Sequence, residues 1–371
     1  MKILKTLLVL SIYIHAVGPT KVATFDRELW GESLSSQSTF DKASRHEILS
    51  YVKQIINTNL STKTALKKFV GRKKVNLLSV QKWKTFTKEK LLQNFQLAQA
   101  TCISSNNLCK KVNSWAELAI MAREYKPKPN KKKWFKASQT FFTYYLYEQA
   151  RLAALFPKTT SEIEKLDVSE VQGFDSSDGE FLLTFDDGPK YKRTKELTLL
   201  LQEKNIHGLF FVLGKNLEKS LSIYGKKKIK KLYSGSCVGS HGFIHKSHQR
   251  LKTWQSSYDK TRALITNNNL QNTLQNKVWF RPPYGQRHKK LIGYLATLND
   301  SVMLWNIDSQ DWNRKLSAKK IEDRVLTLML LHRKGIILFH DIHPKAIKVV
   351  EQLNEYRKQK SVSWVDCRNF E

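Results

Sequence analysis

The sequence predicts a chain of two parts, a helical region over residues 25 to 170 and a parallel α/β barrel or sheet over residues 179 to 371. Up to residue 165, apolar residues recur at helical spacing. Val171–Glu180 is then rich in Gly, Ser and Asp, which is typical of a linker or long turn. After it, short apolar runs alternate with amphipathic helices, as expected where helical crossovers join buried parallel strands.

The chain begins with a predicted signal peptide, residues 1–24. Met1–Lys5 is basic, Thr6–Val17 is apolar, and small residues follow. Pro19 leaves the cleavage site open between Val17 and Thr24. The apolar stretch is too short and interrupted for a good membrane span. We therefore expect a secreted or periplasmic protein with no stable membrane span after cleavage; a buried N-terminal helix is the alternative.

Export implies an oxidising compartment for the four cysteines, Cys102, Cys109, Cys237 and Cys367. Cys102 and Cys109 enclose a short Ser/Asn-rich stretch, which suits a local disulfide and makes a poor zinc site without a nearby histidine. The sequence leaves the pairing of Cys237 and Cys367 open.

Helices are predicted in the first part at His46–Ile56, at Trp83–Ala98, after Ser114, and from about Ala137 to Phe156. No chemical motif accompanies them. Two roles stay open for this region. It could pack beside the carboxyl face of the barrel and shape the approach to the site, or it could be a scaffold against the barrel's side.

The net charge is +32, from 64 Lys and Arg against 32 Asp and Glu in 371 residues. Such a balance attracts polyanions, although a solvated basic surface is the simpler interpretation. Lys131–Lys133 and Lys226–Lys231 raise the hypothesis of a nucleic-acid binder. No nucleic-acid motif accompanies them and the signal peptide argues against it, so we expect no nucleic-acid partner.

Strands are predicted where the second part has short apolar runs. They are Phe181–Phe185, Gly208–Leu213, Cys237–Ser240, Val278–Phe280, Val302–Ile307, Gly335–Phe339 and, weakly, Val362–Val365. Most of these runs end in polar or ionisable residues. In parallel α/β folds the functional site lies at the carboxyl ends of the strands, so these side chains are expected to meet there.

Two of these strand ends together predict a metal site. Asp186 and Asp187 follow the first strand directly. His241 and His245 follow the third, and four residues apart they are expected to face one side of a helical turn. Two histidines and one carboxylate leave coordination positions open, which is typical of a catalytic rather than a structural zinc.

Five motifs occur in order after the linker: TFDDGP, HGFIH, RPPYG, DSQDW and ILFHD. In this order and spacing they resemble the motifs of the polysaccharide deacetylases, the NodB-homology domain of carbohydrate esterase family 4. The resemblance covers about Gly179 to Val365. It implies a distorted parallel (β/α)-barrel, and it leaves the helical region uncovered.

The resemblance also implies a role for each matching residue. Asp186 matches the catalytic base and Arg281 the arginine that orients it. The metal ligands would be Asp187, His241 and His245, binding Zn²⁺ or another divalent metal such as Co²⁺ or Ni²⁺. Gly242 departs from the family, which usually has Ser or Thr at this position.

The remaining matches concern the leaving group and the acetyl pocket. His340 matches the general acid and Asp311 the acid that tunes it. Tyr284 matches the residue whose backbone N–H helps to hold the oxyanion, while Trp312 and Leu338 match the walls of the acetyl pocket.

We therefore expect an exported, metal-dependent hydrolase that removes N-acetyl groups from an N-acetylglucosamine-containing polymer. Peptidoglycan is favoured because a strongly basic exported protein would concentrate on an anionic wall. Chitin, poly-N-acetylglucosamine and acetylated xylan are alternatives within the enzyme class. A non-catalytic glycan-binding protein is the alternative outside it.

Overall fold

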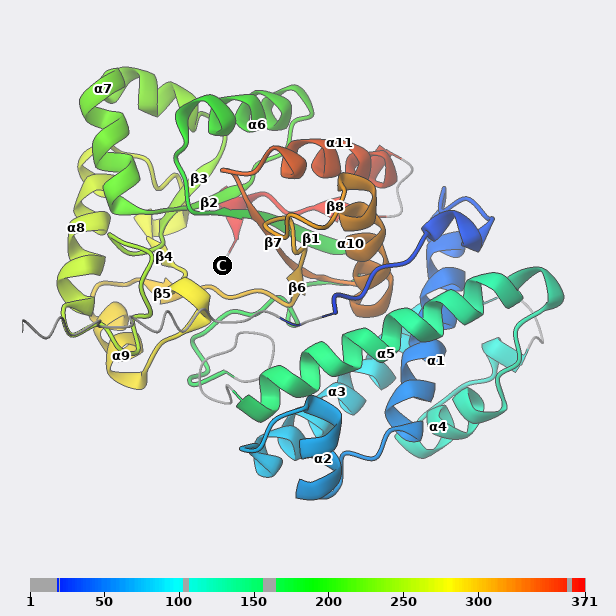
Figure 1. Cartoon of the computed structure of the whole chain (residues 1–371). Helices are drawn as coiled ribbons and strands as arrows, with labels where there is room; N and C mark the ends of the chain where they lie inside the picture. The colour runs from blue at the N-terminus through cyan, green and yellow to red at the C-terminus, as the bar shows by residue number, and fades with distance from the viewer. Residues whose placement is uncertain (1–18, 20, 103–106, 156–164, 359–361, 371) are drawn as a thin grey trace, which may run out of the picture.

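A computed structural model of the chain describes residues 19, 21–102, 107–155, 165–358 and 362–370. Most of the predicted signal peptide lies outside these residues. Ala23 is already part of the fold: it is buried, and its N–H donates to Glu148 Oε1 at 2.6 Å. Figure 1 shows two parts side by side, the helices α1–α5 and the sheet with α6–α11 around it.

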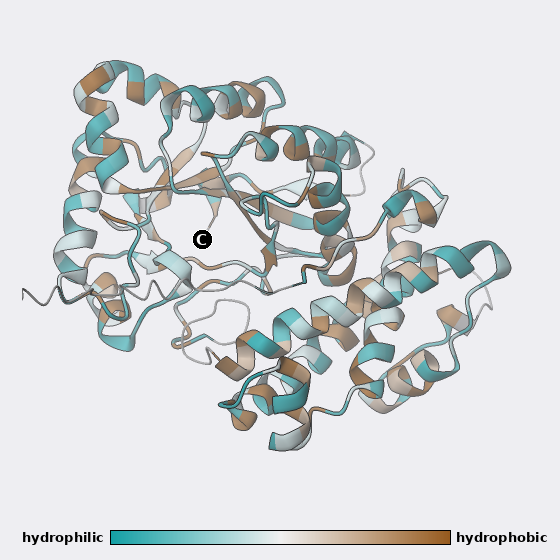
Figure 2. Ribbon diagram, viewed as in Figure 1, coloured by the Kyte–Doolittle hydropathy of each residue, from teal (hydrophilic) through white to brown (hydrophobic). Residues whose placement is uncertain are grey.

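The sheet is parallel and has the order β5-β4-β3-β2-β1-β7-β6, with β8 also paired to β1. Its strands are β1 Glu180–Asp186, β2 Leu209–Val212, β3 Cys237–Ser240, β4 Trp279–Phe280, β5 Ser301–Val302, β6 Ile307–Asp308, β7 Gly335–His340 and β8 Ser363–Trp364. The helices around it are α6 Tyr191–Glu203, α7 Gly214–Leu232, α8 Trp254–Asn267, α9 Lys289–Thr297, α10 Ala318–His332 and α11 Pro344–Lys358. The predicted α/β class is confirmed. Apolar residues gather in the strands, whereas α6 and α7 carry mostly hydrophilic residues (Figure 2).

The prediction of one strand over Val302–Ile307 was wrong, because this segment forms two short strands at opposite ends of the sheet. β5 pairs with β4, and β6 pairs with β7. Between them the backbone changes partners: Met303 N–H donates to Phe280 O at 2.9 Å and Leu304 N–H to Val171 O at 2.7 Å. The segment therefore spans the gap between the two ends of the sheet, which curls the sheet into a distorted barrel.

Within its described residues, the N-terminal part has five α-helices: α1 Gln37–Asn57, α2 Lys63–Val70, α3 Leu77–Ala98, α4 Trp115–Glu124 and α5 Lys132–Leu155. Side-chain caps explain where most of them begin. Ser36 and Thr39 form a capping box that opens α1, and the oxygens of Thr62, Asn76 and Ser114 accept from the first turns of α2, α3 and α4. The predicted helices are confirmed, and α1, α3 and α5 begin before the segments predicted for them. Phe156, the predicted end of the last of these helices, lies outside the described residues.

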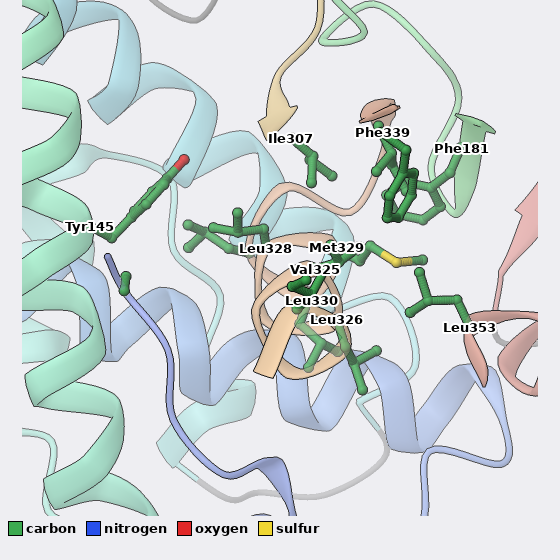
Figure 3. Packing of buried hydrophobic residues seen from close by; sticks show 14 of the residues in the cluster. Tyr145, Phe181, Ile307, Val325, Leu326, Leu328, Met329, Leu330, Phe339 and Leu353 are labelled. Carbon is green, nitrogen blue, oxygen red and sulfur yellow. The ribbon is translucent and has the colours of Figure 1, made fainter. Parts of the chain in front are cut away.

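α10 joins the two parts, because it is buried on every side from Ile321 to Leu331. Figure 3 shows its apolar side chains between Tyr145 of α5 and residues of the sheet and α11. Buried ion pairs add to this packing: Arg324 Nη2 lies 2.7 Å from Glu148 Oε2, and Arg333 Nη2 lies 2.8 Å from Asp41 Oδ1. The helical region thus packs against the barrel's side through α10.

Two disulfides cross-link the chain. Cys102–Cys109 confirms the predicted local bridge, and Cys237–Cys367 supplies the pairing that the sequence left open. The second bridge ties the C-terminal segment to β3 across 130 residues. Within the part of the chain that the structure describes, none of the helices combines the length and the apolar character that a membrane span requires.

We expect removal of the Cys237–Cys367 bridge to lower the free energy of unfolding much more than removal of the Cys102–Cys109 bridge. In the chain-entropy description a long closed loop contributes about 5 kcal/mol and a loop of eight residues about 2.5 kcal/mol. Paired Cys→Ala variants of each bridge, compared by urea unfolding at equilibrium, test this. Equal losses in the two variants would contradict it.

Candidate active site

The candidate site lies at the carboxyl edge of the sheet, where β1, β3 and β7 end. The register of the β1–β7 pair places Asp186 opposite His340 and Thr184 opposite Leu338. Residues two apart in a strand point to the same face, so these four side chains emerge together. The structure thus brings Asp186, His340 and Leu338 of the predicted residues together at this edge.

Asp187, His241 and His245 form the one potential metal-binding cluster found in the part of the chain that the structure describes. Asp187 Oδ1 lies 3.5 Å from His241 Nε2 and 3.6 Å from His245 Nε2. The expected helical turn between the histidines was wrong. Gly242 has a left-handed φ of 77°, and the segment from Gly242 to Lys246 is a loop. The loop places the centroids of the two imidazole rings 5.2 Å apart.

The atoms of this cluster fit a divalent cation. Asp187 Oδ1 is buried and has no hydrogen-bond partner among the described residues, which is costly for a carboxylate oxygen unless an ion satisfies it. His241 Nδ1 lies 2.6 Å from the carbonyl oxygen of Arg281 and must donate to it, which leaves the Nε2 lone pair free. Burial lowers the pKa of His241 well below its usual value, so the ring stays neutral as a ligand requires.

Asp186 is held by a buried arginine. Arg281 Nη1 donates to Asp186 Oδ1 at 2.9 Å, and the arginine is fully buried. Burial raises the pKa of Asp186 to about 6, although the Arg281 charge opposes the rise. The carboxylate is therefore fixed in place yet still basic enough to accept a proton near neutral pH.

His340 is paired with a buried carboxylate. Its Nδ1 lies 2.7 Å from Asp311 Oδ1, and its backbone N–H donates to Asp311 Oδ2 at 2.9 Å. Burial by itself lowers the pKa of His340, but the Asp311 charge outweighs it and raises the pKa to about 10. The imidazole is thus protonated at neutral pH, with Nε2 as the donor that Asp311 leaves free.

The last three predicted residues border these groups. Tyr284 has a left-handed φ of 61°, and its ring packs edge-on against His245 with centroids 4.5 Å apart. Tyr284 and Trp312 are 50% and 40% exposed, which is unusual for large aromatic side chains, whereas Leu338 is only 5% exposed. An unfavourable backbone conformation at a non-glycine residue often accompanies a functional role.

Two residues that hold this arrangement were missed in the sequence. Thr184 Oγ1 accepts from Arg281 Nη1 at 2.7 Å, and Asn216 Nδ2 donates to the carbonyl oxygen of Asp187 at 2.8 Å. Thr184 could have been found, since it lies two residues before Asp186 in the same strand. Asn216 gives no such signal. The structure also explains why glycine stands at position 242. A Cβ there would lie 2.4 Å from Cε1 of buried His248.

Comparison with known proteins finds relatives for the second part of the chain. Residues 175–300 match a family model described as polysaccharide deacetylase. The peptidoglycan-N-acetylmuramic acid deacetylase PdaC of Bacillus subtilis is 30% identical over 176 residues, which are 46% of this chain and 34% of that protein. A bifunctional xylanase/xylan deacetylase of Cellvibrio japonicus is 32% identical over 161 residues, 43% of this chain and 22% of that protein.

A crystal structure of the Bc1960 peptidoglycan N-acetylglucosamine deacetylase superposes with a TM-score of 0.46 at 24% identity, covering 53% of this chain and 90% of that one. The chain spans about a third of PdaC and less of the xylan deacetylase.

Proposed function

We propose, from the match of residues 175–300 to the polysaccharide deacetylase family, that the protein is a metal-dependent hydrolase that removes N-acetyl groups from a glycan polymer. One observation carries the proposal. A metal-ligand triad, a carboxylate fixed by Arg281 and an imidazolium fixed by Asp311 converge on one edge of the sheet. Together they supply an electrophilic site, a base and an acid.

The side chains divide the reaction as follows. A divalent ion held by Asp187, His241 and His245 would polarise the acetamide carbonyl and make a bound water more acidic. Asp186 accepts the proton of the attacking water, and Arg281 keeps its carboxylate aimed. His340 donates a proton from Nε2 to the departing amine. The Tyr284 backbone N–H helps to hold the oxyanion, and Leu338 and Trp312 enclose the acetyl group.

We propose peptidoglycan as the polymer and Zn²⁺ as the metal, in a secreted or periplasmic protein. The name of PdaC and the charge of +32 support an anionic cell-wall glycan. The similarity to a xylan deacetylase keeps acetylated xylan in the comparison, beside chitin and poly-N-acetylglucosamine. Two histidines and one carboxylate suit zinc.

Acetate release from purified polymers tests the proposal. We expect the protein without its leader to release acetate from peptidoglycan, to stop when a chelator is added, and to resume with Zn²⁺. Chitin, poly-N-acetylglucosamine and acetylated xylan are the parallel substrates. Binding of a glycan without acetate release would instead identify a glycan-binding protein.

We expect Asp311→Asn to move the alkaline limb of the pH–rate profile to lower pH by roughly 1–3 units. The Asp311 carboxylate raises the pKa of His340 to about 10, so below that pH the imidazole keeps its proton. Without the charge this pKa falls, and the acid is lost at lower pH. An alkaline limb that stays in place would show that another group supplies the proton.

We propose that the helical region is a scaffold that packs against α10, and not a part that shapes the approach to the site. Glu148→Ala should then lower the free energy of unfolding by about 3–5 kcal/mol, because it leaves Arg324 buried without its partner. Glu355→Ala, at the exposed pair with Lys358, is the matched control and should cost about 1 kcal/mol or less. Urea unfolding compares them, and a similar small loss for Glu148→Ala would argue against the scaffold.

A further inference from the structure

A basic groove opens beside the candidate site, and its lysines and arginines belong neither to the family motifs nor to the proposed reaction. It is lined by the start of α6, one face of α7, and the loops that follow β6 and β7. α6 and α7 pack on each other at the edge of the barrel (Figure 1). We call this hollow the basic groove. Its cationic lining residues are Lys190, Arg193, Lys219, Arg314 and Lys345.

The groove is continuous with the candidate site. Asn216 lines it and donates to the carbonyl oxygen of Asp187. Trp312 lines it and follows Asp311 directly. His343 lines it with its ring 5.9 Å from that of His340. A polymer whose acetamide reached His340 would therefore extend over the groove.

The charged side chains that line the groove are positive. Five of its lining residues are lysine or arginine, and among the described residues that line it none carries a carboxylate. Arg193 pairs with Glu196 at 2.8 Å, and Lys345 Nζ donates to the carbonyl oxygen of Asn313 at 2.6 Å. For Lys190, Lys219 and Arg314, which are exposed, the described residues supply no ion pair. These three cations are therefore available to bind an anion from another molecule.

Aromatic side chains lie among the cations. Tyr191 and Tyr224 stack on each other with ring centroids 3.7 Å apart, and both line the groove. Trp312, which also lines the groove, is 40% exposed. Broad aromatic faces between charges suit a sugar chain that carries charged substituents, because the rings cover its apolar faces while the cations meet its anions.

We propose that the basic groove binds a carboxylate-bearing stretch of the glycan next to the sugar being deacetylated, and so selects acidic over neutral polymers. This rests on the proposed deacetylase activity and adds a specificity site to it. The occupant is a glycan whose substituents carry carboxylates, since charge complementarity and adjoining aromatics favour it over a lipid surface or a nucleic acid.

The test compares one glycan in two charge states. Peptidoglycan fragments with free carboxylates and the same fragments after chemical amidation differ only in charge. The triple variant Lys190→Gln, Lys219→Gln, Arg314→Gln is compared with Lys132→Gln, Lys133→Gln, Lys136→Gln, which removes the same charge from exposed positions on α5. The readout is kcat/KM for acetate release at low and high salt.

We expect wild type and the α5 control to prefer the acidic fragments, with a preference that shrinks as salt rises. In the groove variant the acidic-to-amidated ratio of kcat/KM should fall about tenfold relative to wild type. An unchanged ratio, or an equal fall in the α5 control, would overturn the groove proposal. Absence of acetate release by wild type from both fragments and from the parallel polymers would instead refute the deacetylase proposal itself.

Discussion

Replacing His241 by alanine is expected to remove the bound divalent cation and the release of acetate together. His241 is one of the three proposed metal ligands, and its Nε2 lies 3.5 Å from Asp187 Oδ1. Loss of the ion removes several kcal/mol of charge stabilisation, so kcat/KM should fall at least about a thousandfold. Metal content after dialysis and acetate release, measured on the same samples, test this.

Two further variants separate the metal from the fold. His245→Ala removes a more exposed ligand, whose side chain is 35% accessible, and so disturbs packing less. His207→Ala removes a histidine at the amino end of the barrel, where its Nδ1 lies 2.6 Å from the carbonyl oxygen of Gly235. We expect His245→Ala to behave like His241→Ala, and His207→Ala to keep its metal. A ligand variant with full metal content and full activity would disprove the triad.

The sequence predicted which residues lie together at this edge, because the strand ends can be found from short stretches of sequence. Each strand is a short apolar run that ends in polar residues, and parallel strands bring those ends to one edge. Asp186, Asp187 and His340 therefore met as expected. His241 and His245 met too, but through a loop, because a spacing of four fits both a helical turn and a loop bent at Gly242.

Features set by distant partners could not be predicted. Val302–Ile307 is apolar except at Asn306, which predicts one strand, and only the neighbouring strands show that its backbone hydrogen bonds pass from one end of the sheet to the other. Arg324 and Glu148 look like surface charges in the sequence, yet they form a buried pair. Cys237 and Cys367 are 130 residues apart, so their pairing depends on where the C-terminal segment lies in the fold.

Replacing Asp186 by asparagine is expected to lower kcat by about 10²–10⁴-fold while the protein keeps its metal. The amide preserves the shape of the side chain but cannot take the proton of the attacking water. The change also leaves Arg281, which is fully buried, without its counter-charge. A loss of stability must therefore be separated from a loss of chemistry.

The double variant Asp186→Asn, Arg281→Met makes this separation, because it removes both charges of the buried pair. Replacing a whole buried pair by neutral groups of similar size costs far less stability than breaking it. We expect the double variant to recover much of the unfolding free energy lost in Asp186→Asn and none of the activity. Recovery of acetate release together with stability would mean that Asp186 serves the fold, and that the proton acceptor is another group.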